Sequence, residues 1–380
     1  MSKKVLISGV TGQDGSYMAD YLLKNTDYEI YGLIRRLSHP NHDNLSEALK
    51  NPRFKLITGD LSDSQSIDKV VEKIKPDYFI NLAAQSFVFS SWELPEQTMD
   101  INSTGVLRCL EAIVRHCPNC RFYNAGSSEQ FGDVQYSPQD EKHPHRARSP
   151  YGASKISAHH LVKTYRESNN LYAIQGLLFN HESERRGEEF VTRKITKGVA
   201  RIYHAIKNNQ SFEPIELGNL DAKRDWSHAE DFVDGIWKML NQDNYCNLNK
   251  IKIDQELGAI YTEEQKIKCL SKQIKEYVLS SQETHSIREF IELAFNKAGI
   301  EGNWSFQGTI GGYVPPENEI FKFNEQILVK INPIYYRPAD VEILLGNSTK
   351  ARQELGWKPK VSFNELVSRM VQNDIKNYNP

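Results

Sequence analysis

The sequence predicts a doubly wound α/β fold, in which a parallel sheet carries helices on both faces. Two observations favour this fold. Short apolar runs alternate with longer amphipathic stretches through the first half of the chain, and a glycine-rich turn follows the first apolar run. At 380 residues the chain is longer than an average domain, so a second, smaller lobe is expected beside the sheet.

The alternation sets out the first half in order. Strands are predicted at residues 5–7, 29–34, 55–58, 78–82 and 121–125, and helices at residues 16–24, 64–75 and 102–116. We therefore expect a Rossmann domain over residues 1–180, together with about 226–243.

The second half is less regular and predicts a mixed substrate lobe over residues 181–225 and 284–380. Helices are expected at residues 190–207, 231–241, 285–299, 347–356 and 362–378. Residues 244–283 are rich in Lys, Gln and Asn, and we predict a polar surface insertion there.

Charge and cysteine content narrow the class of protein. Lys and Arg total 47 against 49 for Asp and Glu, a net charge of −2, which removes the electrostatic basis for a nucleic-acid or membrane-surface protein. No stretch approaches the roughly 18 apolar residues of a membrane span. Five cysteines, an odd number, do not make a disulfide framework, so we expect a cytoplasmic protein.

The glycine-rich turn points to a dinucleotide. Residues 9–15, GVTGQDG, space their glycines as GxxGxxG and open the first predicted helix. Glycines there permit a tight turn and the close approach of a pyrophosphate, and the helix N-terminus offers N–H groups to it. A plain tight turn is the alternative for this motif.

The strand ends add further cofactor contacts. The second predicted strand ends in residues 32–36, GLIRR, without the carboxylate typical of NAD sites, so Arg35 favours NADP. A solvated face is the alternative for these arginines. Asp60 and Leu61 end the third strand, and residues 81–86, NLAAQS, end the fourth, where two alanines allow backbone to approach the cofactor.

Tyr151 and Lys155 carry the strongest chemical signal. Four residues apart, they share one face of a helix. A Lys ammonium beside a phenol lowers the pKa of the Tyr from about 10, so Tyr151 is expected to take a proton from an alcohol while hydride leaves for a nicotinamide. Ser127 is expected to hydrogen-bond the reacting hydroxyl. Glu129 adds an acid–base carboxyl that a plain dehydrogenase does not need.

The CxxC sequence at residues 117–120 has no second CxxC or suitably spaced His pair. It predicts a turn rather than zinc ligands, and no metal site is expected.

With these motifs the chain resembles the extended short-chain dehydrogenase/reductase family and, within it, the GDP-mannose 4,6-dehydratase family. The matching strings are residues 9–17 (GVTGQDGSY), 178–183 (LFNHES), 185–187 (RRG), 190–194 (FVTRK), 217–226 (LGNLDAKRDW), 335–338 (YYRP) and 357–359 (WKP). The resemblance implies that Tyr151 and Lys155 oxidise the 4-hydroxyl of the sugar and that Glu129 removes the carbon-5 proton and protonates the departing 6-hydroxyl. Hydride held on NADP would then return to carbon 6.

The strand ends and the resemblance together give the expected binding residues. Those for the cofactor are Gly9, Thr11, Gly12, Gln13, Asp14, Arg35, Asp60, Leu61, Leu82, Ala83, Ala84, Ser86, Tyr151, Lys155, His181 and Arg186. Those for the nucleotide sugar are Ser86, Asn180, Lys194, Leu217, Gly218, Arg224, Arg337 and Asp340. The resemblance also implies a homo-oligomer, dimer or tetramer, through the loop at residues 36–44.

Departures from the family pattern leave alternatives open. Phe87 stands where His is common, Gln97 and Phe131 where Tyr is common, Gln130 where an apolar residue is common, and Asp340 where Glu is common. Several of these flank the predicted sugar pocket, so a GDP-manno-heptose is the alternative substrate. A sugar-nucleotide epimerase or reductase and a dinucleotide-sensing binding protein are the other hypotheses; Glu129 argues against the former and the Tyr151–Lys155 pair against the latter.

Overall fold

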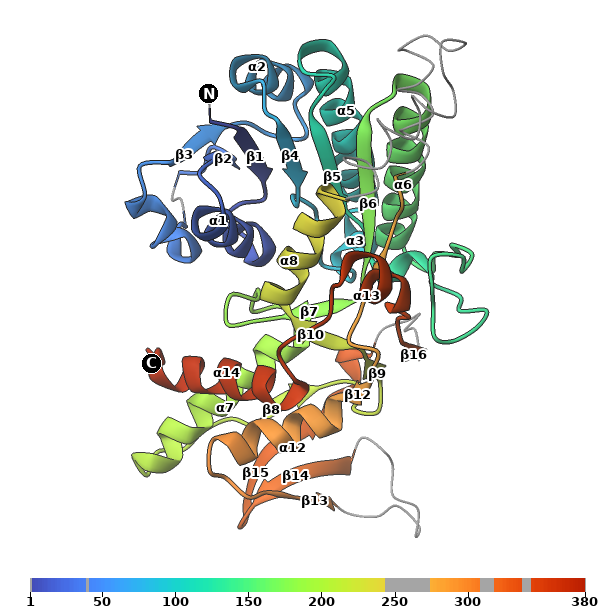
Figure 1. Ribbon diagram of the computed structural model, residues 1–380. Coiled ribbons are helices and arrows are strands. Elements are labelled where there is room, and N and C mark those ends of the chain that lie inside the picture. Colours follow the sequence, from blue (N-terminus) through green and yellow to red (C-terminus); the bar gives the residue numbers. More distant parts are fainter. Residues whose placement is uncertain (1, 39–40, 243–273, 308–317, 337–342, 380) are drawn as a thin grey trace, which may run out of the picture.

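The computed structural model of the protein describes residues 2–38, 41–242, 274–307, 318–336 and 343–379. Figure 1 shows a sheet half, which contains the N-terminus, and a lobe on which the chain ends. Within the described residues, no helix is both long and apolar enough to cross a membrane.

The sheet half is built on seven parallel strands. They lie in the order β11-β6-β5-β4-β1-β2-β3, so the strand order reverses between β1 and β4. The strands are β1 (Lys4–Ser8), β2 (Glu29–Ile34), β3 (Phe54–Thr58), β4 (Tyr78–Asn81), β5 (Arg121–Ala125), β6 (Tyr172–Leu178) and β11 (Val278–Leu279). The predicted fold class and its five predicted strands are confirmed, and a reversal of this kind is where such sheets bind their ligands.

Alternate side chains along the strands pack into two separate hydrophobic cores, one on each face of the sheet. Val5 and Ile7 pack with α1 (Gln13–Asn25) and α8 (Ala229–Leu240) on one face. Leu6 faces the opposite core, where the helices are α2 (Ser64–Ile74), α5 (Gly105–His116) and α6 (Pro150–Asn169). Burial of both faces explains why these strands are apolar runs rather than alternating ones. Short helices α3 (Ser90–Glu93) and α4 (Pro95–Met99) precede α5.

The end of the segment predicted as a polar insertion differs from that prediction. Ile274, Tyr277, Val278 and Leu279 are buried, and β11 pairs in parallel with β6 as the outermost strand of the sheet. These apolar side chains gain burial against β6, so the last part of the segment belongs to the core. Residues 244–273 lie outside the described residues.

The lobe has its own core between helices and small sheets. Its helices are α7 (Val191–Lys207), α12 (Ile287–Lys297), α13 (Thr349–Leu355) and α14 (Phe363–Lys376), close to the predicted ranges. Its strands are β7 (Asn180–Glu182), β8 (Ile215–Leu217), β9 (Lys223–Arg224), β10 (Trp226–His228), β12 (His285–Ser286), β13 (Asn303–Phe306), β14 (Glu319–Phe323), β15 (Gln326–Ile331) and β16 (Ile343–Leu344). Most of these strands are too short for periodicity to reveal them.

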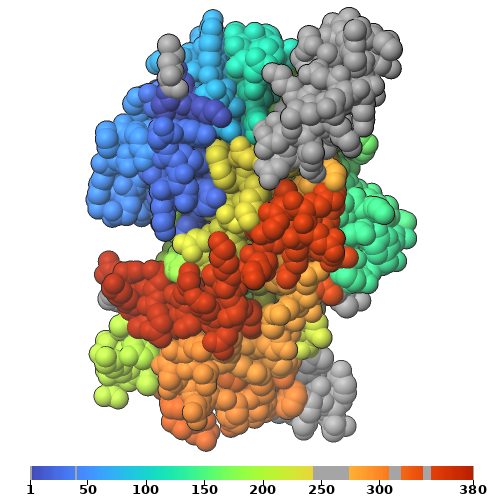
Figure 2. All heavy atoms as spheres, viewed as in Figure 1, coloured from blue at the N-terminus to red at the C-terminus, as the bar shows by residue number. Residues whose placement is uncertain are grey.

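The C-terminal segment ties the two halves together. The buried Trp357 donates its indole N–H to the carbonyl of Asp231 on α8 (2.7 Å), while α14 packs on α7 and α12 of the lobe. Figure 2 shows this segment, in red, lying across the molecule between the sheet half and the orange surface of the lobe. The halves therefore meet along the edge to which the strands of the sheet point.

Candidate active site

The glycine-rich turn has the backbone geometry that a dinucleotide loop needs. Gly9 has a φ of +66°, and a Cβ there would lie 2.7 Å from the backbone nitrogen of Ala83. A Cβ on Gly15 would lie 2.2 Å from the carbonyl oxygen of Gly9. Gly12 precedes α1 without a side-chain cap, so no side chain competes for the N–H groups of the first turn. The loop and helix thus fit a pyrophosphate.

Two predicted cofactor residues meet at the start of α1. His181 on β7 places Nε2 2.8 Å from a carboxylate oxygen of Asp14 and Nδ1 2.8 Å from the carbonyl oxygen of Phe179. Its ring stacks on Phe232, with centroids 4.3 Å apart. Burial lowers the pKa of His181, but the Asp14 carboxylate outweighs it, so the pKa is raised overall. With acceptors at both nitrogens, the imidazolium form is favoured.

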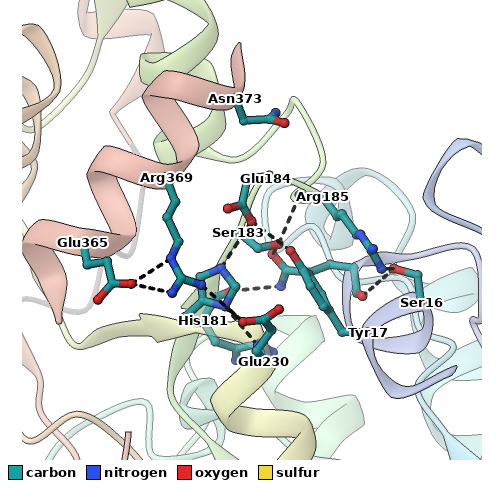
Figure 3. Close-up of polar contacts among 12 residues, drawn as sticks. Ser16, Tyr17, His181, Ser183, Glu184, Arg185, Glu230, Glu365, Arg369 and Asn373 are labelled. Carbon is teal, nitrogen blue, oxygen red and sulfur yellow. Dashed lines mark hydrogen bonds and ion pairs between the residues drawn. The ribbon is translucent and has the colours of Figure 1, made fainter. Parts of the chain in front are cut away.

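Further contacts hold β7 against α1. The Gln13 amide donates to the carbonyl of His181 (3.0 Å) and accepts from the hydroxyl of Ser183 (2.7 Å). Arg185 donates to the Ser16 hydroxyl (3.1 Å), and its guanidinium lies 4.2 Å from the ring centre of Tyr17. Figure 3 shows Ser16 and Tyr17 of α1 facing Ser183 and Arg185, which follow β7. The Gly-rich turn and the lobe therefore share one wall of the site.

Tyr151 and Lys155 lie in the first turns of α6, which begins at Pro150 and is capped by Ser149. Both are buried, with exposed fractions of 7% and 4%. Lys155 donates from Nζ to the carbonyl of Ala125 at the end of β5 (2.8 Å), and its Nζ lies 5.7 Å from the centre of the Tyr151 ring. The predicted pair thus sits on one face of the helix, against the carboxyl end of the sheet.

Ser127 and Glu129 lie in the turn that follows β5. The Ser127 hydroxyl accepts from the backbone N–H of Glu129 (3.2 Å) and is hydrogen-bonded to Tyr151. A Cβ on Gly152 would lie 2.7 Å from the carbonyl oxygen of Glu129, so this turn packs tightly on α6. The structure therefore brings all four predicted catalytic residues to one place.

The pKa of Tyr151 differs from the sequence-based expectation. Burial raises it to about 12, whereas hydrogen bonding with Ser127 acts in the opposite direction. Burial lowers the pKa of Lys155 to about 8. The expected lowering of the Tyr151 pKa by Lys155 is wrong for this structure, because desolvation of the phenolate dominates and the ammonium is directed to the Ala125 carbonyl.

The other predicted cofactor residues line the carboxyl ends of β2, β3 and β4. Arg35 is exposed directly after β2, and Asp60 accepts from the backbone and side chain of Ser62 (2.9 and 2.8 Å). Leu61 is buried, and Leu82 and Ala83 donate backbone N–H groups to the Ser8 hydroxyl. The remaining predicted positions along this edge are Thr11, Ala84 and the exposed Ser86. All lie on the edge to which the glycine-rich turn belongs.

The predicted sugar-nucleotide residues fall into separate parts of the lobe. Lys194 on α7 has its ammonium 3.6 Å from the ring centre of Tyr335, and a Cβ on Gly218 would lie 2.5 Å from the Tyr335 carbonyl oxygen. Burial lowers the pKa of Lys194. Leu217 ends β8 beside Gly218, whereas Asn180 begins β7 and Arg224 ends β9, in two other sheets. Arg337 and Asp340 lie outside the described residues.

Comparison with known proteins follows this geometry. A sequence profile described as GDP-mannose 4,6 dehydratase matches residues 6–256 and 261–370. The GDP-mannose 4,6 dehydratase of Drosophila melanogaster is 43% identical over 383 residues, covering 98% of this chain and 86% of the relative. The chain belongs to the GDP-mannose 4,6-dehydratase family. The family member from Vibrio cholerae is 39% identical, covering 99% of this chain and 95% of the relative.

Solved structures share the fold at much lower identity. The dTDP-glucose 4,6-dehydratase of Bacillus anthracis, in complex with NAD, has a TM-score of 0.70 at 17% identity and covers 99% of this chain and 97% of its own. RMD from Pseudomonas aeruginosa, complexed with NADPH, has a TM-score of 0.70 at 18% identity and covers 99% of this chain and 100% of its own. These structures support the Rossmann fold of the GDP-mannose 4,6-dehydratase family member described here.

Two residues near the site were not predicted from the sequence. Glu182, buried between His181 and Ser183, accepts from the Thr192 hydroxyl (2.6 Å) and lies 3.0 Å from Nε of Arg186. Tyr335 provides the ring under Lys194. Both residues lie inside sequence strings that match the family, so the family resemblance could have identified them as candidates. In the described part of the chain, no group of three or more His, Cys, Asp or Glu side chains is arranged to hold a metal.

Proposed function

We propose that this chain is a GDP-mannose 4,6-dehydratase that uses tightly bound NADP. The observation that carries the proposal is the close packing of the Ser127–Glu129 turn on α6, where the Glu129 carbonyl leaves no room for a Cβ at position 152. This packing holds the backbone of Glu129 against the helix that carries Tyr151 and Lys155, and the charge of Glu129 acts to raise the Tyr151 pKa. Elimination needs an acid–base carboxyl, and simple alcohol oxidation does not.

The chain's residues divide the proton transfers between them. Tyr151, held by Ser127 and flanked by Lys155, would act as the phenolate and take the proton of the sugar's 4-hydroxyl as that carbon is oxidised to a ketone. The ketone acidifies carbon 5, whose proton Glu129 removes and then gives to the departing 6-hydroxyl, which leaves as water. A bound nicotinamide would take hydride from carbon 4 and return it to carbon 6. Carbon 5 then regains a proton, which the protonated Tyr151 would give up, so that the net change is the loss of one water.

Burial determines the protonation state of Tyr151 before ligands bind. At a pKa of about 12 its phenol is protonated at neutral pH, so it loses its proton only when a neighbouring positive charge compensates. Lys155 lies on the same face of α6 but donates to the Ala125 carbonyl, so a bound, cationic nicotinamide ring would have to supply that charge. The phenol is thereby kept inert until ligands are bound.

The cofactor and the substrate are assigned to neighbouring surfaces. The dinucleotide would bind over Gly9, Thr11, Gly12, Gln13 and Asp14, with the other predicted contacts along the strand ends and His181 and Arg186 closing the wall. Ser86 and Asn180 would face the sugar, and Lys194, Leu217, Gly218 and Arg224 the nucleotide, together with Arg337 and Asp340. We also propose a homo-oligomer; light scattering that gives the monomer mass of 43.7 kDa would contradict it.

The preference for NADP rests on Arg35. It follows β2, next to the glycine-rich turn, where NAD-binding proteins usually place a carboxylate. We expect Arg35→Ser to weaken NADPH binding at least tenfold and to leave NADH binding nearly unchanged, as measured by nicotinamide fluorescence. Arg53→Ser serves as the control, because the Arg53 guanidinium donates to the backbone carbonyls of Leu23 and Thr26. Equal losses for both dinucleotides would contradict the assignment.

The decisive test is mass spectrometry of the products after incubation with GDP-mannose and no added reductant. We expect loss of one water without net consumption of nicotinamide. A change in sugar configuration without mass loss would instead favour an epimerase, and reaction only with GDP-manno-heptose would change the sugar. If the protein converts none of the sugar nucleotides tested, the hypothesis of a dinucleotide-sensing binding protein is favoured.

Glu129→Gln separates dehydration from oxidation. We expect it to lower the dehydration rate at least a thousandfold while the first hydride transfer still produces absorbance of reduced nicotinamide. Glu93→Gln, at an exposed carboxyl on α3, is the control and should behave like the wild type. Unimpaired dehydration by Glu129→Gln would overturn the proposed mechanism.

A further inference from the structure

A row of buried amide side chains crosses the sheet directly below the proposed active site. It consists of Asn81 on β4, Asn124 on β5, Gln175 on β6 and Gln130 in the turn after β5. None is more than 2% exposed. Buried amides are costly unless paired, so this row must be explained by its hydrogen bonds.

Each amide donates to the next in one direction. The Asn81 amide donates to the carbonyl of Asn124 (2.7 Å), which donates to that of Gln175 (2.5 Å). At the near end, the Ser8 hydroxyl donates to Asn81 and accepts the backbone N–H groups of Leu82 and Ala83 (3.2 Å each). Ala83 is the residue that packs on Gly9, so the row begins at the dinucleotide turn.

At its far end the row reaches the catalytic residues. The Gln175 amide nitrogen donates both to the side-chain carbonyl of Gln130 (3.0 Å) and to the backbone carbonyl of Lys155 (3.1 Å). The same Gln130 oxygen accepts the backbone N–H of Ser127 (3.0 Å). One amide group therefore joins the turn that carries Ser127 to the helix that carries Lys155.

The backbone around the Gln175 amide is closely packed. The N–H of Gly126 donates to the carbonyl of Gly176 (3.0 Å), and a Cβ on Gly126 would lie 2.2 Å from that oxygen and 3.0 Å from Cγ of Gln175. The amide nitrogen of Gln130 is buried without a hydrogen-bond partner among the described residues. Gln130 is thus oriented by its oxygen alone, which accepts from both Ser127 and Gln175.

We propose that Gln175 is a positioning residue, which sets the distance between Ser127 and the Tyr151–Lys155 face through the amide of Gln130. The inference rests on the proposed function, because that function gives these groups their catalytic roles. A side chain acting in this way affects the geometry of hydride and proton transfer more than ligand binding. Misplacement of a reacting group by about 1 Å is enough to lower a rate by about a hundredfold.

The test replaces the amide by an apolar chain of similar length, Gln175→Met. We expect kcat for dehydration of GDP-mannose to fall between tenfold and a hundredfold, while KM for GDP-mannose and the affinity for NADPH stay within about twofold. Thermal unfolding is measured in parallel, because loss of a buried hydrogen-bond partner also lowers stability.

Gln242→Met is the matched control. Gln242 is equally buried, and its amide bonds to the backbone of Met239 and Lys275, away from the site. We expect a similar fall in Tm with unchanged kcat. If Gln175→Met also retains its kcat, or if KM rises in step with the loss of kcat, the positioning role is overturned.

A second variant keeps the test informative if Gln175→Met does not fold. Gln175→Asn retains the amide but is one methylene too short to reach both Gln130 and Lys155, and the same loss of kcat is expected at smaller cost in Tm. Wild-type kcat in Gln175→Asn would overturn the inference alone. A wild-type protein that dehydrates neither GDP-mannose nor GDP-manno-heptose would overturn the proposed function, and the inference with it.

Discussion

The two sides of the proposed site are held in different ways. On the sheet side, Gly9, Gly15 and Gly152 each touch backbone so closely that a Cβ would not fit, and Tyr151 and Lys155 are almost fully buried. On the lobe side, Lys194 is half-buried and leans on Tyr335, which is 48% exposed. The proposed catalytic residues are thus held by backbone packing, whereas Lys194, a proposed nucleotide-binding residue, is held by a side-chain contact at a partly exposed surface.

This contrast predicts where substitutions act. A change on the sheet side should lower kcat or stability steeply, because packed backbone cannot relax around it. A change on the lobe side should weaken binding while leaving the reaction itself intact. Four substitutions test these expectations, from the largest expected effect to the smallest.

Tyr151→Phe should have the largest effect. We expect kcat to fall at least a thousandfold, about 4 kcal/mol of transition-state stabilisation, because the variant loses the phenolic oxygen proposed to accept the 4-hydroxyl proton. Tyr165→Phe, on the same helix but bonded to Glu111, is the control. Steady-state kinetics with GDP-mannose measures both. Residual activity within tenfold of the wild type would exclude Tyr151 as the acid–base residue.

Gly9→Ala should have the next largest effect, which we expect to be a loss of stability. At a φ of +66° an Ala is strained, and its Cβ would meet the backbone of Leu82 and Ala83 at less than 3 Å. We expect a loss of about 3 kcal/mol in urea unfolding, together with loss of dinucleotide binding. Gly356→Ala isolates the strain, because that glycine has a φ of +59° and nothing within 4 Å of the added Cβ. Equal losses for the two variants would show that close packing at Gly9 has no separate cost.

The sheet side was also the side that the sequence predicted best. Its strands alternate with helices at regular spacing, and the glycine turn, Ser127, Glu129, Tyr151 and Lys155 occupy short strings next to those strands. Local periodicity and local motifs are sufficient to place these candidate residues in the fold, because each lies within a few positions of the element that holds it.

Contacts between distant segments could not be predicted in this way. β11 is only two residues long and gains its stability from pairing with β6. It follows a polar stretch of sequence, so the sequence did not predict a core strand there. The pKa of Tyr151 depends on how completely other elements bury it, and the Gln175–Gln130 contact joins two segments that give no pattern in sequence. Burial and pairing of this kind are properties of the folded chain alone.

The junction between the two sides supplies the third test. The Glu184 carboxylate accepts from the Tyr17 hydroxyl (2.8 Å), as Figure 3 shows, and lies 3.2 Å from Nε2 of His228. Burial opposes ionisation, but these hydrogen bonds lower the pKa of Glu184 to about 2, against an ordinary value of 4.5. A lowered carboxyl pKa contributes stability that is fully present above pH 4.5 and is lost as the pH falls toward 2.

Glu184→Gln should therefore lower the free energy of unfolding by about 2 kcal/mol at pH 7, and by progressively less below pH 4.5. Urea unfolding at a series of pH values measures it. Glu188→Gln, at an exposed carboxyl of the same loop that pairs with Lys197, should cost less than about 0.5 kcal/mol throughout. A loss for Glu184→Gln that does not depend on pH would mean that packing, not the charge, joins the two halves.

Lys194→Met should have the smallest effect and the most specific one. We propose that its ammonium contacts the pyrophosphate of the substrate, and a single charge-assisted contact at a half-buried site corresponds to about a tenfold change in affinity. We expect KM for GDP-mannose to rise about tenfold with kcat unchanged, because the contact is the same in the ground and transition states. Lys197→Met, one turn away on α7 and exposed, is the control. If kcat falls instead while KM is unchanged, the lobe takes part in the chemistry, and the division between a rigid catalytic side and a binding side no longer holds.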